Sequence, residues 1–187
     1  ELMTPALLHS VLDRILGADF SCFYREVVYS APALGINQFF YQKEILPYII
    51  LMPNVGGRGA MWQEIEGRRR NTPARMLISI FHTDDPETSL LHMCGEYRWE
   101  LCKTVQGVHW NDVTDPSLTS IYTDYLQFYK KNHSLSEDQK EKVRDEIKKS
   151  SNKYREVFIT DYIQYMKYEQ NGSLRLNRVA RTILFTL

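Results

Sequence analysis

The chain has 187 residues, 43% hydrophobic and 12% aromatic, which is enough to fill the core of one globular domain. This composition excludes collagen-like, low-complexity and disordered classes. Basic and acidic residues balance at 23 each, so no net charge draws the chain to nucleic acid or to an anionic membrane.

A residue that caps helices precedes a proline at four places. The side-chain oxygen of the cap accepts a hydrogen bond from the first helical turn. Proline fits the next position, because the N–H that it lacks would have no partner there. The four pairs predict four helix starts: Thr4-Pro5, Thr72-Pro73, Asp85-Pro86 and Asp115-Pro116.

Three helices are predicted in the first fifty residues from apolar residues at helical spacing. They cover Pro5 to about Leu16, Ser21 to Tyr29, and Ile36 to about Leu46. The most apolar run, Ile45 to Met52, is too short to cross a bilayer, which takes about twenty residues as a helix. The N-terminus has no basic stretch followed by an apolar one, so it does not resemble a signal peptide.

The next segment combines a glycine-rich loop with two short elements. Residues 53–59 (PNVGGRG) form the loop, and a short helix is predicted around Met61 to Glu66. Residues 74–81 are ambiguous, because their β-branched side chains suit a strand whereas the preceding Thr-Pro pair favours a helix. We expect a helix there.

The second half of the chain predicts five further helices. The first has an apolar face with one polar exception, Arg98, and the third begins at a capping box over Ser134 to Glu137. The third is mostly solvated, whereas its neighbours carry broad apolar stripes. The five helices cover Pro86 to about Val105, Pro116 to Lys131, Glu137 to Lys149, Tyr154 to Glu169, and a last stretch from Leu174.

From these elements we expect about seven to nine helices with short loops, which predicts a single all-α domain over residues 1–187. We see no internal repeat and no linker. The chain opens on Glu1-Leu2-Met3 and ends inside an apolar run, so we expect it to be a fragment of a longer protein.

The segment from residue 54 to 75 is the most distinctive candidate site. Backbone N–H groups of glycines can converge on an anion, and guanidinium groups bind phosphate with two parallel hydrogen bonds. The segment therefore suggests binding of a phosphorylated ligand or a nucleic-acid backbone. Its candidate residues are Gly56, Gly57, Arg58, Gly59, Trp62, Arg68, Arg69, Arg70 and Arg75.

A second interpretation of this segment is a surface loop whose arginines pair with acidic neighbours. The phosphate-loop pattern GxxxxGK[ST] is absent. Trp62 could stack on a base, or it could anchor a short helix to the core. Both alternatives remain open from the sequence.

No other residues form a recognisable catalytic or metal-binding set, and no cofactor is expected. His82, Asp84 and Asp85 (HTDD) lack a second histidine cluster, and Glu96 and Glu100 share a helix face that we expect to meet water. The three cysteines follow no metal-ligand spacing. We expect them to be buried, reduced thiols of a cytoplasmic protein: Cys22, Cys94 and Cys102.

Three runs resemble a helical domain of uncharacterised bacterial proteins, some of which also carry a cyclic-nucleotide-binding domain. The runs are LPYIILMPNVGGRGAMWQEIEGRRRNTPARM, GEYRWELCKTVQG and LNRVARTILF. The resemblance covers the chain from about Phe23 onward. It implies a regulatory or output module beside a sensor, and it supplies no catalytic residue.

We therefore expect a non-enzymatic helical module that regulates or mediates association in a bacterial signalling protein. Its expected partners are other domains of the parent protein or a second copy of the chain. The alternative is binding of a phosphorylated ligand or of nucleic acid through residues 54–75. Nucleic acid is the less expected of these two partners, because the total charge is neutral, and no membrane association is expected.

Overall fold

The computed structural model describes residues 2–55, 59–62, 73–81, 85–105 and 118–186, with the backbone alone at 25–31, 36–42, 62 and 101–105. The predicted all-α class with seven to nine helices is wrong, because these residues form six α-helices and five strands. The helices are α1 (Pro5–Ala18), α2 (Pro86–Val105), α3 (Leu118–Phe128), α4 (Glu137–Lys149), α5 (Tyr154–Lys167) and α6 (Arg178–Leu184). The strands are β1 (Tyr24–Ala31), β2 (Ile36–Glu44), β3 (Tyr48–Met52), β4 (Ala60–Trp62) and β5 (Arg75–Ser79).

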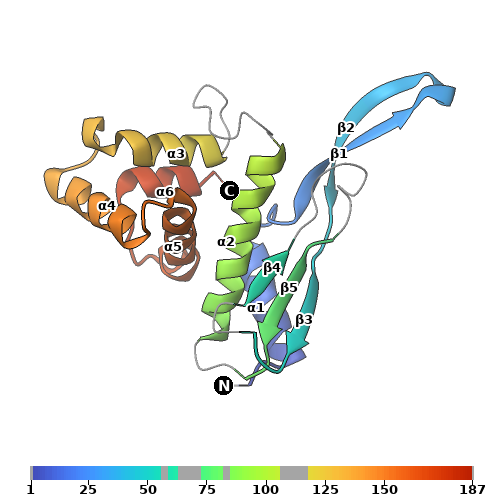
Figure 1. Ribbon diagram of the computed structural model, residues 1–187, viewed down its shortest axis with the longest axis horizontal. Coiled ribbons are helices and arrows are strands. Elements are labelled where there is room, and N and C mark those ends of the chain that lie inside the picture. Colours follow the sequence, from blue (N-terminus) through green and yellow to red (C-terminus); the bar gives the residue numbers. More distant parts are fainter. Residues whose placement is uncertain (1, 56–58, 63–72, 82–84, 106–117, 187) are drawn as a thin grey trace.

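Strands β1 and β2 form a hairpin where the sequence predicted two helices, over 21–29 and 36–46. The strands are antiparallel, and Val27, Val28 and Tyr29 lie opposite Tyr41, Phe40 and Phe39 in the register. β-Branched and aromatic residues favour strands, and cross-strand pairs of these types stabilise a hairpin. Figure 1 shows this hairpin extending away from the rest of the molecule.

Strand β5 replaces the helix predicted over residues 74–81. It lies in the middle of a three-stranded sheet, parallel to β3 on one side and antiparallel to β4 on the other. Met76 and Ile78 are fully buried, as alternate residues of a strand with one face on the core should be. The β-branched content therefore outweighed the Thr-Pro pair, and Thr72 itself lies outside the described residues.

The short helix predicted around Met61 to Glu66 is not observed at its start, because Met61 lies in strand β4. The preceding Gly59 has a structural role. Gly59 has a φ of +69°, and a Cβ built on it would lie 2.6 Å from the carbonyl oxygen of Leu77. Only glycine tolerates both the left-handed backbone and this close approach. The glycine thus lets the chain enter β4 against β5.

Helix α2 lies at the centre of the molecule and has the bounds that the sequence predicted. It begins after Asp85, whose carboxylate accepts a hydrogen bond from the backbone N–H of Glu87 at 3.1 Å. In Figure 1 the strands and α1 lie on one side of α2, and the cluster of α3, α4, α5 and α6 lies on the other. Helix α2 contacts α1, β4 and β5 as well as α3 and α5.

The C-terminal helices begin and end near their predicted residues. Helix α4 starts at a capping box, although this box joins Ser136 to Gln139 and not Ser134 to Glu137. The Ser136 hydroxyl accepts from the backbone N–H of Gln139, whose side chain in turn accepts from the N–H of Ser136. The predicted cap at Asp115-Pro116 lies outside the described residues.

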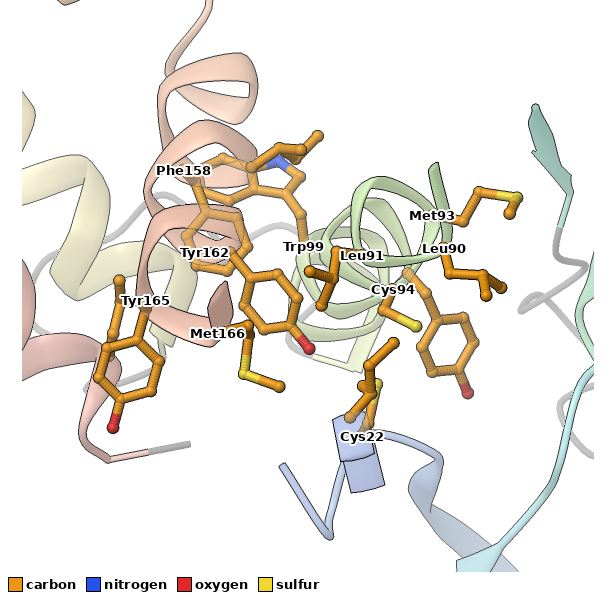
Figure 2. Close-up of a cluster of buried hydrophobic side chains, with 14 of the residues drawn as sticks. Cys22, Leu90, Leu91, Met93, Cys94, Trp99, Phe158, Tyr162, Tyr165 and Met166 are labelled. Atoms are coloured by element: carbon orange, nitrogen blue, oxygen red, sulfur yellow. The ribbon is translucent and has the colours of Figure 1, made fainter. Parts of the chain in front are cut away.

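The interface of α2 with α5 carries much of the aromatic core (Figure 2). The rings of Trp99 and Phe158 are 5.3 Å apart, and Tyr122 of α3 packs edge-on against Phe158 at 5.2 Å. Gly95 lets the two helices approach closely, because a Cβ there would lie 3.2 Å from the ring of Tyr162. Aromatic pairs in these geometries add to the burial of apolar area.

Candidate functional site

The Gly/Arg-rich segment proposed from the sequence falls largely outside the described residues. Those not described are Gly56, Gly57, Arg58, Arg68, Arg69 and Arg70. Of the others, Gly59 packs against β5, and Arg75 is exposed on β5. Trp62 of β4 is the register partner of Arg75. The structure thus places Trp62 and Arg75 opposite one another on adjacent strands.

Two other sequence features have structural roles. Asp85 caps α2 and forms an ion pair with Lys167, while His82 and Asp84 lie outside the described residues. The expectation that Glu96 and Glu100 face water is wrong. Both carboxylates bind Arg155 of α5, at 3.2 and 3.4 Å, and so help to join α2 to α5.

A cleft of about 810 Å³ lies between α2, the end of α4, and α5. Side chains spaced three or four residues apart on α2 form one wall, and a similarly spaced series on α5 forms another, because such residues share one helix face. The α2 wall consists of Asp85, Thr88, Ser89 and His92. Cavities of 300 to 1,000 Å³ are typical of small-molecule sites.

The turn from α4 to α5 forms part of the cleft wall. Ser151 and Asn152 both have positive φ angles, 53° and 61°, which residues with a side chain rarely adopt. Hydrogen bonds from these two N–H groups to the carbonyls of Lys148 and Ile147 hold the turn in place. Ser151 itself lines the cleft.

Asp161 of α5 is the most deeply buried carboxylate on the cleft wall, with 4% of its surface exposed. The Tyr122 hydroxyl donates a short hydrogen bond to its Oδ2 atom. The pKa of Asp161 is raised to about 7, mainly by burial and also by the charge of Glu146, although the hydrogen bond from Tyr122 opposes the shift. Within the described residues, Tyr122 is the one donor to this carboxylate.

Glu146, on the last turns of α4, is a second cleft carboxylate with a raised pKa. Burial is the main cause, and Lys149 and Lys142 on the same helix partly offset it. Glu146 also raises the pKa of Asp161, so its negative charge acts on the second carboxylate that lines the cleft. Two like charges in a partly buried space destabilise each other when both are ionised.

Gln164 contributes an unsatisfied acceptor to the same wall. Its Oε1 atom is buried, and no described residue donates a hydrogen bond to it. A buried polar atom without a partner costs about 1–3 kcal/mol, so a water or a bound molecule that donates to this oxygen would be stabilised.

Asp85 is a third carboxylate that lines the cleft. Lys167 donates to its Oδ2 atom, and the Thr88 hydroxyl donates to the same oxygen at 2.9 Å. Partial burial opposes ionisation of Asp85, but these bonds outweigh it and lower the pKa. Asp85 is therefore a satisfied, ionised carboxylate, in contrast to Asp161.

A second buried polar network lies where α2, α5 and the end of α1 meet. Arg98, the predicted polar exception on α2, binds the fully buried Asp19 through two hydrogen bonds, one of them 3.0 Å long. Tyr162 donates to the same carboxylate at 3.0 Å. These partners satisfy one another, so the network has a structural role.

The thiols of Cys22 and Cys94 are free and fully buried, as the sequence predicted. They point toward one another beside this network (Figure 2). Contact with Cys94, together with burial, raises the pKa of Cys22 well above its usual value. The side chain of Cys102 is not described.

The outer face of the three-stranded sheet carries exposed apolar side chains. Alternate residues of the edge strand β3 point away from the core, and these are Tyr48, Ile50 and Met52. Leu77 of β5, opposite Ile50 in the register, is half-buried. A contiguous exposed patch of this type is common at protein interfaces.

Sequence reasoning missed the cleft. Asp161 did leave a signal, because it interrupts the apolar stripe of α5 between Val157 and Tyr165 as Arg98 interrupts that of α2. Glu146 left none, since acidic residues are frequent along the solvated helix α4.

No group of described residues has the three His, Cys, Asp or Glu side chains that could hold a metal ion. None of the described helices has the length and apolar character that a membrane span requires. Neither a curated protein nor a solved structure matches the chain. A family model does match residues 107–187, the part that contains α3 to α6, and its description is a domain of unknown function, DUF8509.

Proposed function

We propose that this chain is a non-enzymatic regulatory module that binds a small polar molecule in the cleft between α2, α4 and α5. The observation that carries the proposal is the pairing of an 810 Å³ cleft with the buried carboxylate of Asp161, whose pKa is about 7. Buried groups with perturbed pKa values that line a cleft are typical of functional sites.

The regulatory part of the proposal follows from the position of the cleft. Two walls belong to α4 and α5, within the residues that DUF8509 covers, and the third belongs to α2, which also packs against the sheet. A ligand would therefore contact both halves of the molecule at once. Its binding energy would stabilise their packing, because a ligand stabilises the state that binds it.

The experiment that tests this function is a thermal-shift screen with a matched pair of variants. Thr160 is exposed, lines the cleft, and its hydroxyl donates to the carbonyl four residues earlier at 2.9 Å. Thr182 of α6 makes the same bond at 2.8 Å, is also exposed, and lies outside the cleft. Thr160→Trp should fill the cleft, and Thr182→Trp serves as its control.

Compounds from a library of small metabolites should raise the melting temperature of the natural protein and of Thr182→Trp, but not that of Thr160→Trp. A ligand at 100 times its Kd stabilises the folded state by about 2.7 kcal/mol. If no compound raises the melting temperature, or if every shift persists in Thr160→Trp, the cleft is not the binding site.

The exposed outer face of the sheet favours a second candidate function, association with a second copy of the chain. Ile50 lies at the centre of this face, so Ile50→Lys should shift a dimer toward monomer in sedimentation experiments. Leu174→Lys is the control, because Leu174 is also exposed but lies before α6. A monomer at all concentrations would eliminate this candidate.

We further propose a cytoplasmic location, which the free thiols of Cys22 and Cys94 support. A place in a bacterial signalling protein, beside a cyclic-nucleotide-binding domain, rests on the sequence resemblance alone.

A further inference from the structure

We infer that the cleft is selective for an organic ammonium group, held between the carboxylates of Asp161 and Glu146 with Gln164 Oε1 as a third acceptor. The inference rests on the proposed function, because it names the chemical class of the ligand for the same cleft.

The interior of the cleft offers acceptors that lack donors. Asp161 receives one hydrogen bond, at Oδ2, and no described residue donates to its Oδ1. Gln164 lies three residues later on the same face of α5, and its buried Oε1 also lacks a donor among the described residues. An ammonium group has three N–H donors and no acceptor, which complements this set.

The two carboxylates provide an electrostatic reason to bind a cation. Each has a raised pKa, and burial is the main cause for both. A positive charge between them would favour the ionised form of both acids and would remove their mutual repulsion. Binding of an ammonium group should therefore tighten as the pH rises through about 7.

Other charged groups also face this space from each surrounding element. Lys149 and Lys153, which oppose a cation, are exposed, so solvent and salt screen them more than the buried acid. Asp85 is occupied by Lys167, and Glu156 by Arg155. The titratable and charged groups on the cleft are Asp85 and His92 from α2, Glu146 and Lys149 from α4, Lys153 from the turn, and Glu156 and Asp161 from α5, with Tyr122 of α3 bonded to Asp161.

The same residues disfavour a metal ion as the cation. No described set of three His, Cys, Asp or Glu side chains could hold one, and calcium needs six to eight oxygen ligands. An ammonium group has three N–H donors and needs only three acceptors, so it suits two carboxylates and one glutamine. The volume of about 810 Å³ leaves room for the organic part of the ligand.

The test uses a four-carbon series that differs in one functional group: butylamine, butan-1-ol and butyrate. Each is titrated to about 20 mM into the ¹⁵N-labelled full chain while amide chemical shifts are followed, since weak Kd values are expected for so small a ligand. Butylamine should shift the amides of Asp161 and Gln164, and it should bind more tightly at about pH 8 than at about pH 6. The alcohol and the carboxylate should not shift these amides.

Two isosteric variants and a control test whether the carboxylates of Asp161 and Glu146 bind the ammonium group. Asp161→Asn and Glu146→Gln should each weaken butylamine binding by about tenfold or more, the effect of removing a charge-assisted hydrogen bond. Asp138→Asn removes an exposed carboxylate of α4 outside the cleft and should leave the Kd unchanged. Because the two variants act separately, a folding defect in one leaves the other informative.

The outcomes separate this inference from the proposed function. If butan-1-ol or butyrate binds the cleft as well as butylamine, the ammonium selectivity is wrong while ligand binding in the cleft stands. If butylamine binds equally to Asp161→Asn and Glu146→Gln, the assigned residues are wrong and the inference fails. If no compound of the series shifts the cleft amides, the inference also fails, and the library screen with Thr160→Trp decides the proposed function independently.

Discussion

Replacing Asp161 with asparagine should stabilise the protein at alkaline pH and change it little in acid. Asp161 is 4% exposed, and burial raises its pKa from 3.8 to about 7. The folded state therefore holds a proton that the unfolded chain has released between these pH values. The stability that depends on the neutral carboxyl group is fully present below about pH 4 and is lost as the pH rises toward 7.

The size of the effect follows from the two pKa values. At about 1.4 kcal/mol per pH unit, ionising Asp161 in the folded protein costs about 4 kcal/mol at pH 8. Asparagine carries no charge and still offers an oxygen to the Tyr122 hydroxyl. At pH 8 the free energy of unfolding of the variant should therefore exceed that of the natural protein by up to about 4 kcal/mol. The variant should accordingly unfold at a higher urea concentration.

Urea unfolding at about pH 4.5, 6 and 8 measures the difference directly. The stability gap between Asp161→Asn and the natural protein should grow with pH, whereas the exposed Asp138→Asn should show no such trend. A gap that is the same at all three pH values, or a variant that is less stable at pH 8, would refute the reasoning about burial.

Two further substitutions test the contacts of α2 by urea unfolding. Gly95→Val places side-chain atoms against the ring of Tyr162, where a Cβ alone is already 3.2 Å away. This substitution should lower the free energy of unfolding by about 1–3 kcal/mol. An unchanged urea midpoint would show that α2 and α5 can move apart without loss of stability. Arg98→Met leaves the fully buried carboxylate of Asp19 without its cation and should cost about 3–5 kcal/mol. Asp19→Asn in the Arg98→Met background should recover part of that loss, and no recovery would mean that the charge is not its cause.

The helices of the second half were predictable because local signals and packing agree there. Helix α2 has a cap at Asp85 and an apolar face that meets α5, and both features are visible in the sequence. The capping box of α4 was placed two residues early, because Ser134 and Ser136 both precede acidic or amide residues at suitable spacing.

The strands were not predicted for two reasons. Some pair with segments distant in the sequence, and others contain apolar residues whose spacing also fits a helix. Strand β5 pairs with β3, more than twenty residues earlier, and no local pattern reports this contact. For the hairpin, the local signal was present in the pairs of Val28 with Phe40 and Tyr29 with Phe39, but apolar residues there also fit a helical period. Residue type was the better guide than spacing.

The cleft could not be predicted, because it depends on how three helices meet. Asp85 and His92 come from α2, Glu146 from α4, and Asp161 from α5, and nothing in the sequence relates these positions. The sequence pointed instead to glycines and arginines in residues 54–75. For Gly59 the structure supplies a packing reason, and Trp62 and Arg75 are register partners in the sheet.

The central position of α2 means that the region matched by the family model does not contain its whole core. The DUF8509 match begins at residue 107, yet the rings of Phe158 and Tyr162 bury themselves against Trp99, Gly95 and Cys94, all of which precede that boundary. Residues 107–187 alone would expose this aromatic surface to water. In this chain the helices of residues 107–187 therefore depend on α2, which lies before the matched region, to complete their core.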